Sequence, residues 1–182
     1  RVTRWLAKKM IEIACKMVDK ILTPTEELAD WLISEGIKTD KVLTIKNAIT
    51  TSKLDIKKSR AEIRAQLGVD EETILVAFHG MLANYYNIET LDYLRRISRI
   101  IGKELRKIKF LVMGYYKKVP VKDENFIYTG YVENLHEYLN AVDLAILPIF
   151  TNSLGIRSRL LDYFAMSVPV ITTSVGVTGM KF

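Results

Sequence analysis

The sequence predicts an α/β fold, a doubly wound parallel sheet with helices on both faces. Strand and helix patterns alternate along the 182 residues. The strands are continuous apolar runs, such as 73–79 and 109–113, which is typical of strands covered by helices on both sides. Three strands end at or just before a glycine, Gly80, Gly114 or Gly130, and ligands of such folds bind at the carboxyl ends of the strands.

The amino-terminal part of the chain contains two helix patterns and two short strand patterns. Apolar residues recur at helical spacing in the first helix. Thr23 is predicted to cap the second helix, because Pro24 suits its first turn and Glu26 completes a capping box. The expected elements are a helix over 2–17, a strand over 20–22, a helix that ends at Gly36 and a strand over 41–45.

A polar stretch over 46–58 lacks periodicity and is predicted to be a linker. Ser59 and Glu62 form a second capping box, and Gly68 ends the short helix that it starts. The elements expected after it are strands over 73–79, 109–113, 126–128, 144–147 and 168–172, with helices over 87–106, 133–141 and 156–166. The helix over 87–106 is expected to turn Ile88 and Leu91 toward the core.

The composition narrows the class of protein. The net charge is +6, and the basic residues gather in the opening helix and over 95–109, where solvated helix faces are expected. Cys15 is the one cysteine, so an internal disulfide is excluded and a reducing, cytoplasmic setting is expected. No apolar run reaches the length that spans a bilayer. Trp5 in the basic opening helix leaves peripheral contact with the inner face of a membrane open.

One segment combines backbone donors, a cation and a carboxylate. Gly155 is expected to open the helix over 156–166, and the N–H groups of a first helical turn bind phosphate well. Arg159 and Asp162 follow at spacings that place them on the same helix face as Gly155. A nucleoside diphosphate needs donors and a cation for its phosphates and a carboxylate for its ribose hydroxyls. The spacing also fits a surface ion pair between Arg159 and Asp162, worth roughly 0.2–0.5 kcal/mol.

This segment resembles the carboxy-terminal motif of the retaining, nucleotide-sugar-dependent glycosyltransferases with a GT-B fold, often called family 4. After Asp162 come Ala165, Pro169-Val170-Ile171 and the loop Gly176-x-x-Gly179. The resemblance holds in register over 19–179. The matching pieces are Asp19–Thr25, Asn47-Ala48-Ile49, Phe78-His79-Gly80 with Asn87, Tyr128–Val132 and Ala141–Leu144.

The resemblance implies the Rossmann-like half of a GT-B fold, truncated at both ends. The expected parts are the tail of an N-terminal domain over 1–46, an interdomain linker with a short helix over 47–71, and an incomplete nucleotide-sugar-binding domain over 72–182. The full enzyme would transfer a hexose from a nucleoside-diphosphate sugar with retention, without a metal or another cofactor. The missing half would bind the acceptor, a glycan or a lipid-linked molecule. The isolated fragment would be inactive, and no nucleic acid partner is expected.

The resemblance also assigns donor-binding residues, while the catalytic residues stay unassigned. The donor-binding residues are Gly80 at the floor of the site, Tyr131 and Val132 at the nucleobase, Asp162 at the ribose, and Arg159 with the backbone of Gly155 and Ile156 at the diphosphate. Met81 and Tyr86 depart from the family pattern, because many members have cations there. Leu154 stands in place of an acidic residue, and Asp162 is one methylene shorter than the usual glutamate.

Two other functions remain open at this point. A GT-B nucleotide-sugar epimerase would carry acidic and histidine side chains in its cleft. A non-enzymatic module would bind nucleotide sugars without turnover, or nucleic acid in a salt-dependent way. His79 either faces the donor or is a satisfied buried imidazole, and His136 is expected on a polar helix face. No cluster of His, Cys and Asp has metal-ligand spacing.

Overall fold

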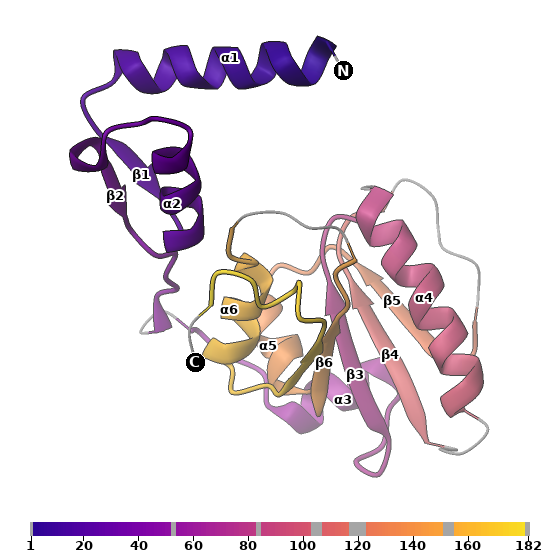
Figure 1. The fold of residues 1–182 in the computed structure, drawn as a ribbon. Coiled ribbons are helices and arrows are strands. Elements are labelled where there is room, and N and C mark those ends of the chain that lie inside the picture. Colours follow the sequence, from indigo (N-terminus) through magenta and orange to yellow (C-terminus); the bar gives the residue numbers. More distant parts are fainter. Residues whose placement is uncertain are drawn as a thin grey trace. The chain divides into compact units, whose positions relative to one another are not determined.

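The computed structural model describes residues 2–51, 54–82, 85–102, 107–116, 123–150 and 155–180. They form two compact units (Figure 1). The first unit contains 2–48 together with 155–157 and 177–180; the second contains 158–176 and the described residues of 49–150. Within these ranges, no helix has an apolar stretch long enough to cross a membrane.

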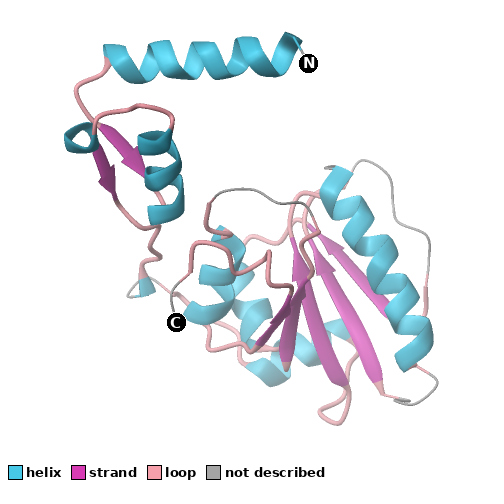
Figure 2. Ribbon diagram, viewed as in Figure 1, coloured by secondary structure: helices cyan, strands magenta, loops and turns pink. Residues whose placement is uncertain are grey.

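The first unit is built on two parallel strands that are joined through a helix (Figure 2). β1 and β2 pair in register from Ile21 with Val42 to Thr23 with Thr44. The elements are α1 (Val2–Met17), β1 (Ile21–Thr23), α2 (Glu26–Ser34), the 3-10 helix η1 (Thr39–Lys41) and β2 (Val42–Thr44).

The start of α2 differs from the sequence prediction. Its N-cap is Thr25, whose Oγ1 accepts a hydrogen bond from the N–H of Leu28 at 3.2 Å. Thr23 belongs to β1 instead, and its hydroxyl lies 3.2 Å from that of Thr44 across the strand pair. The prediction that Thr23 caps this helix was wrong because strand pairing extends through Thr23.

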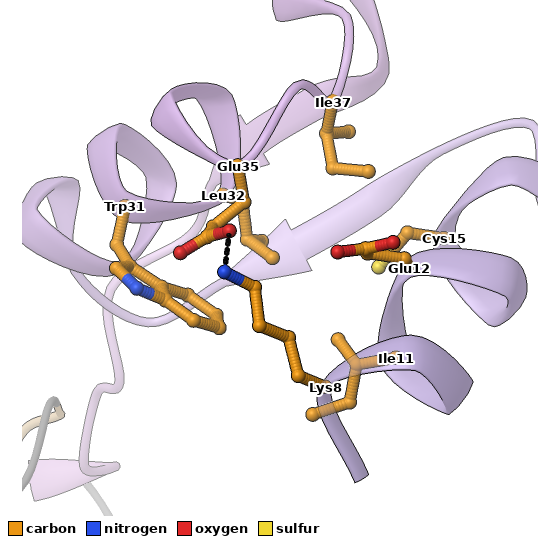
Figure 3. A pocket seen from close by; sticks show the side chains of 8 residues that line it. All are labelled: Lys8, Ile11, Glu12, Cys15, Trp31, Leu32, Glu35 and Ile37. Carbon is orange, nitrogen blue, oxygen red and sulfur yellow. Dashed lines mark ion pairs between the residues drawn. The ribbon is translucent and has the colours of Figure 1, made fainter. Parts of the chain in front are cut away.

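Residues of α1, of α2 and of the segment after α2 line a small pocket in this unit (Figure 3). Lys8 of α1 reaches Glu35, just after α2, and forms an ion pair beside the ring of Trp31. Ile11 and Cys15 line the same space from α1. Because exposed ion pairs contribute only about 0–1 kcal/mol, we expect the apolar contacts to supply more of the packing energy.

The second unit contains five parallel strands in the order β5-β4-β3-β6-β7. Numbered along the chain, these strands follow the order 3-2-1-4-5 of a doubly wound, Rossmann-like sheet, which confirms the predicted fold class. The strands are β3 (Ile74–His79), β4 (Ile108–Met113), β5 (Phe126–Gly130), β6 (Leu144–Leu147) and β7 (Val170–Thr172). In the described part of this unit, four helices flank the sheet: α3 (Arg60–Leu67), α4 (Tyr85–Ile101), α5 (Leu135–Asn140) and α6 (Ser158–Ala165).

Helix α3 has the boundaries that its sequence signals predict. Ser59 and Glu62 form the capping box, and Gly68 closes the helix at a φ of 68°. The helix is held to the sheet by Arg64, a fully buried side chain that donates to three backbone carbonyls. The cap signals therefore determine where α3 begins and ends, and a buried cation determines how it docks.

The buried face of α4 is only partly the predicted one. Leu91 is buried as expected, whereas Ile88 is exposed. Two polar side chains, Asn87 and Thr90, are buried in its place. They are accommodated because Asn87 donates to the carbonyl of Met81 at 2.7 Å, and Thr90 donates to the carbonyl of Pro148 at 3.3 Å.

Candidate functional site

The topological switch point of the sheet lies between β3 and β6. The chain leaves β3 toward β4 on one side and enters β6 and β7 on the other. Crevices form at such points outside the carboxyl ends of the strands, where ligands of doubly wound folds bind. The carboxyl end of β3 is His79, followed at once by Gly80.

The guanidinium of Arg159 lies at this end of β3. Its Nη1 donates to the carbonyl of His79 at 2.9 Å and to Oδ1 of Asn87 at 3.1 Å. The central carbon of the guanidinium lies 5.5 Å from the ring centroid of Phe78. These contacts come from β3 and α4, so the orientation of the positive charge is determined before any ligand binds.

Gly80 leaves room for that guanidinium. A Cβ at this position would lie 2.9 Å from Nη1 of Arg159, and the backbone φ of 153° also disfavours larger residues. A Cβ at Gly114, after the neighbouring strand β4, would lie 1.8 Å from the carbonyl oxygen of Gly80. The two glycines therefore allow close approach of backbone and side chain at the strand ends.

Replacing Gly80 with alanine is expected to destabilise the second unit by roughly 1–3 kcal/mol, because Arg159 must move and the backbone is strained. Gly68→Ala is the matched control, since Gly68 has a positive φ but nothing within 4 Å of a Cβ. We expect that control to lose roughly 1 kcal/mol less than Gly80→Ala, because it has the backbone strain without the displaced guanidinium. Urea unfolding followed by far-UV circular dichroism measures both. An equal loss in the two variants would mean that the close approach to Arg159 does not matter.

The carboxylate of Asp162 reaches the same strand end, one helical turn beyond Arg159. Its Oδ2 lies 3.8 Å from Nε2 of His79. Burial raises the pKa of Asp162, and the charge of His136 acts in the opposite direction. Burial also lowers the pKa of His79 from 6.5 to about 4, and the positive charges of Arg159 and His136 lower it further. Although the distance would suit an ion pair, the imidazole is therefore neutral at neutral pH.

Gly155 and Ile156 do not open the helix that follows them. α6 begins at Ser158, so the expectation that Gly155 starts this helix and shares a face with Arg159 was wrong. Gly155 has a φ of 130°, a conformation outside the helical region. Both residues group with the first unit, whereas Arg159 and Asp162 belong to the second.

Tyr131 and Val132 directly follow β5, one of the two edge strands of the described sheet. They therefore lie at the carboxyl end of their strand, the same edge to which Gly80 belongs. Tyr131 is 77% exposed and Val132 is half-buried. A tyrosine with this exposure can offer its ring to a flat partner.

Two residues of this region were not assigned to the site from the sequence. Asn87 fixes Arg159, and only its place in the Phe78-His79-Gly80…Asn87 pattern pointed to it. His136 on α5 was expected on a polar helix face, yet its Nε2 is buried and its charge acts on both His79 and Asp162. Of the departures from the family pattern, Met81 is exposed. Leu154 and the side chain of Tyr86 lie outside the described residues.

The chemistry of this edge is that of an oriented cation beside a carboxylate. A guanidinium suits phosphate oxygens, and a carboxylate accepts hydrogen bonds from sugar hydroxyls. Among the described residues, no group of three or more His, Cys, Asp or Glu side chains could hold a metal ion. Recognition of an anionic, hydroxylated ligand by these side chains is what the arrangement supports.

Comparisons with known proteins agree with this geometry. A family model described as glycosyl transferases group 1 matches residues 73–181. No curated protein sequence matches the chain.

Solved structures share the fold. Anabaena HepE in complex with UDP and glucose has a TM-score of 0.67 at 12% identity, over 90% of this chain and 46% of that one. WaaG, a glycosyltransferase involved in lipopolysaccharide biosynthesis, has a TM-score of 0.65 at 21% identity, over 88% and 45%. A glycosyltransferase from Rickettsia africae has a TM-score of 0.69 at 13% identity, over 89% and 45%. The chain thus spans about half the length of these proteins.

Proposed function

This chain belongs to the glycosyl transferases group 1 family, and from that premise we propose that its second unit binds the nucleotide of a nucleoside-diphosphate sugar. The observation that carries the proposal is the meeting of Arg159 and Asp162 at the carboxyl end of β3. These side chains come from α6, the helix after β6, and so flank the switch point of the sheet. The likeness to structures solved with UDP supports the same ligand class.

In this proposal Arg159 binds the diphosphate and Asp162 binds the ribose. The guanidinium is already oriented by His79 and Asn87, so it can stabilise charge on the leaving diphosphate without reorganising. Tyr131 and Val132 would contact the base, and Gly80 would line the floor. The proposed reaction is transfer of a hexose with retention, with no metal and no cofactor beyond the donor substrate.

The acceptor and the cellular setting are part of the same proposal. A glycan or lipid-linked acceptor would be bound mostly by the half of the enzyme that this chain does not include. Contact with the inner face of a membrane is supported by α1, where the exposed side chains of Trp5, Met10 and Met17 accompany Lys9 and Lys16. We propose a cytoplasmic protein with no nucleic acid partner.

The test is binding of UDP, GDP and ADP, measured by calorimetry and by thermal shift. We expect one of them to bind, and Asp162→Asn and Arg159→Gln each to weaken it by roughly tenfold or more, because each removes a charge-assisted hydrogen bond. Asp162→Glu is expected to bind nearly as well as the unchanged protein, since it keeps the carboxylate.

Two controls match the charge changes away from the switch point. Glu72→Gln removes a carboxylate that precedes β3, at the opposite end of this strand. Arg99→Gln removes an exposed cation in the last turn of α4. Equal affinities in the site variants and these controls would remove Arg159 and Asp162 from the proposed site. Salt-dependent binding of DNA or RNA, with no nucleotide binding, would favour the nucleic-acid alternative.

A further inference from the structure

A buried imidazole at the end of β3 has a ring nitrogen without a partner. The side chain of His79 is 10% exposed, and its Nε2 forms no hydrogen bond with any described residue. Its neighbour Asp162 lies at 3.8 Å, beyond hydrogen-bond distance. Buried polar atoms in folded proteins nearly always have a hydrogen-bond partner, so this nitrogen requires an explanation.

The position of the ring follows from its surroundings. The backbone N–H of His79 donates to the hydroxyl of Tyr163 at 3.3 Å. The rings of His79 and Tyr163 pack edge to face, with centroids 4.9 Å apart. On the other side, the carbonyl of His79 accepts from Arg159. Because backbone and ring are both held, Nε2 cannot readily turn to another protein partner.

The charges around Nε2 select the kind of group that fits beside it. A neutral imidazole can donate or accept at Nε2, depending on its tautomer. The carboxylate of Asp162 disfavours an anion here, and the guanidinium of Arg159 disfavours a cation. A hydroxyl satisfies both neighbours, because it accepts from Nε2–H and donates to the carboxylate at the same time.

We infer that His79 and Asp162 together bind one ribose hydroxyl of the nucleotide, which makes His79 a specificity-determining residue for ribonucleotides. This inference rests on the function proposed above. It assigns the imidazole a direct contact with the ligand, in contrast to a role limited to packing against Tyr163. Loss of the hydroxyl from the ligand, or of Nε2 from the protein, should then remove the same interaction.

The first test observes Nε2 directly in the unchanged protein. The chain contains two histidines, so the ring nitrogens of 15N-histidine-labelled protein give few signals, and His136→Gln assigns them. UDP, ADP and GDP are added in turn, followed by the 2′-deoxy and 3′-deoxy forms of the nucleotide that binds. We expect the Nε2 signal of His79 to shift with the ribonucleotide and to stay near its free position with one deoxy form. A ribonucleotide that binds by calorimetry and leaves this signal unmoved would overturn the inference.

The second test compares affinities in a cycle of variants and ligands. His79→Leu removes the nitrogen, whereas His79→Gln places an amide nitrogen near the position of Nε2. The relevant comparison is between the ribonucleotide and the deoxy form that leaves the Nε2 signal of His79 near its free position. We expect the preference for the ribonucleotide to fall about tenfold in His79→Leu and to be largely kept in His79→Gln. If His79→Leu does not fold, the ring-nitrogen signals of the unchanged protein still show whether Nε2 of His79 contacts the nucleotide.

The outcomes of these tests distinguish failure of this inference from failure of the proposed function. If none of the three nucleotides binds the unchanged protein, the proposed function fails and the role of His79 falls with it. If Asp162→Asn weakens binding while His79→Leu keeps the full preference for the ribonucleotide, the proposed function stands. In that case His79 is a packing residue only.

Discussion

Replacing Arg64 with alanine is expected to lower the free energy of unfolding of the second unit by roughly 3–5 kcal/mol. The side chain is 1% exposed and lies between α3 and the sheet. Its Nη1 donates to the carbonyl of Ala141 at 2.9 Å, and its Nη2 donates to the carbonyls of Asp70 and Thr73. The substitution would leave buried acceptors without donors, and each unsatisfied group costs about 1–3 kcal/mol.

Asp143 extends this network. Its carboxylate lies 3.4 Å from Nη1 of Arg64, accepts from Nη2 of Arg60 at 2.6 Å, and accepts from the N–H of Leu75 at 2.7 Å. These hydrogen bonds and the charges of Arg60 and Arg64 lower the pKa of Asp143, against the effect of its own burial. The cation of Arg64 thus joins α3 to the starts of both β3 and β6, the two strands that flank the switch point.

Two variants separate hydrogen bonding from packing. Arg64→Met keeps an apolar side chain in place of the arginine stem, and we expect it to be nearly as destabilising as Arg64→Ala because the donors are gone. Arg60→Ala removes a side chain that is about one third exposed, and should cost only about 1 kcal/mol. Both tryptophans lie in the first unit, so far-UV circular dichroism in urea follows the second unit better than fluorescence does. A loss below about 1 kcal/mol in Arg64→Ala would contradict this account of the docking of α3.

The stability of the second unit is expected to fall in acid partly because of His79. Its pKa is about 4 in the folded protein and 6.5 as the ordinary value. The unfolded chain therefore binds the proton more tightly, and stability is lost as the pH falls from 6.5 toward 4. The loss is roughly 2 kcal/mol by pH 5 and roughly 3 kcal/mol by pH 4, at 1.36 kcal/mol per pKa unit.

The groups that face His79 act together on this titration. Burial is the largest cause of the lowered pKa, and the charges of Arg159 on α6 and His136 on α5 add to it. Asp162 faces the ring as well, and its own pKa is raised by burial. Since other carboxylates also titrate in acid, the unchanged protein must be compared with a variant that lacks the imidazole.

His79→Gln provides that comparison. Between pH 7 and pH 4, the free energy of unfolding of the unchanged protein should fall by roughly 3 kcal/mol more than that of His79→Gln. Proton NMR of the His79 ring should give a midpoint near pH 4 in the folded protein. A midpoint near 6.5, or a difference that does not change with pH, would show that the ring is hydrated and not desolvated by its neighbours.

Local signals in the sequence were sufficient for most of the fold. Apolar runs predicted β3 and β4, because strands covered on both faces need apolar residues throughout. The capping box at Ser59 and the stop at Gly68 predicted both ends of α3. The ordered motifs from 19 to 179 pointed to a glycosyltransferase family, and the family model over 73–181 confirms it.

The starts of two helices differ from what the sequence predicts. Thr23 has every local feature of an N-cap, but its pairing with Thr44 keeps it in β1. Likewise Gly155 precedes a helical pattern, yet α6 begins only at Ser158. At Thr23 a strand pairing outside the local pattern overrides the helix-capping propensity, whereas at Gly155 the backbone itself is not helical, with a φ of 130°.

The sequence by itself determined the α/β class, the alternation of elements, the family and the two charged residues on which the proposed site depends. Only the tertiary structure decided that Asn87 fixes Arg159, and that His79 meets Asp162, a residue 83 positions away in the chain. The physical reason is that periodicity reports which face of an element is buried. Which elements meet at a strand end depends on the strand order, which places β6 beside β3 although β4 and β5 intervene in the chain.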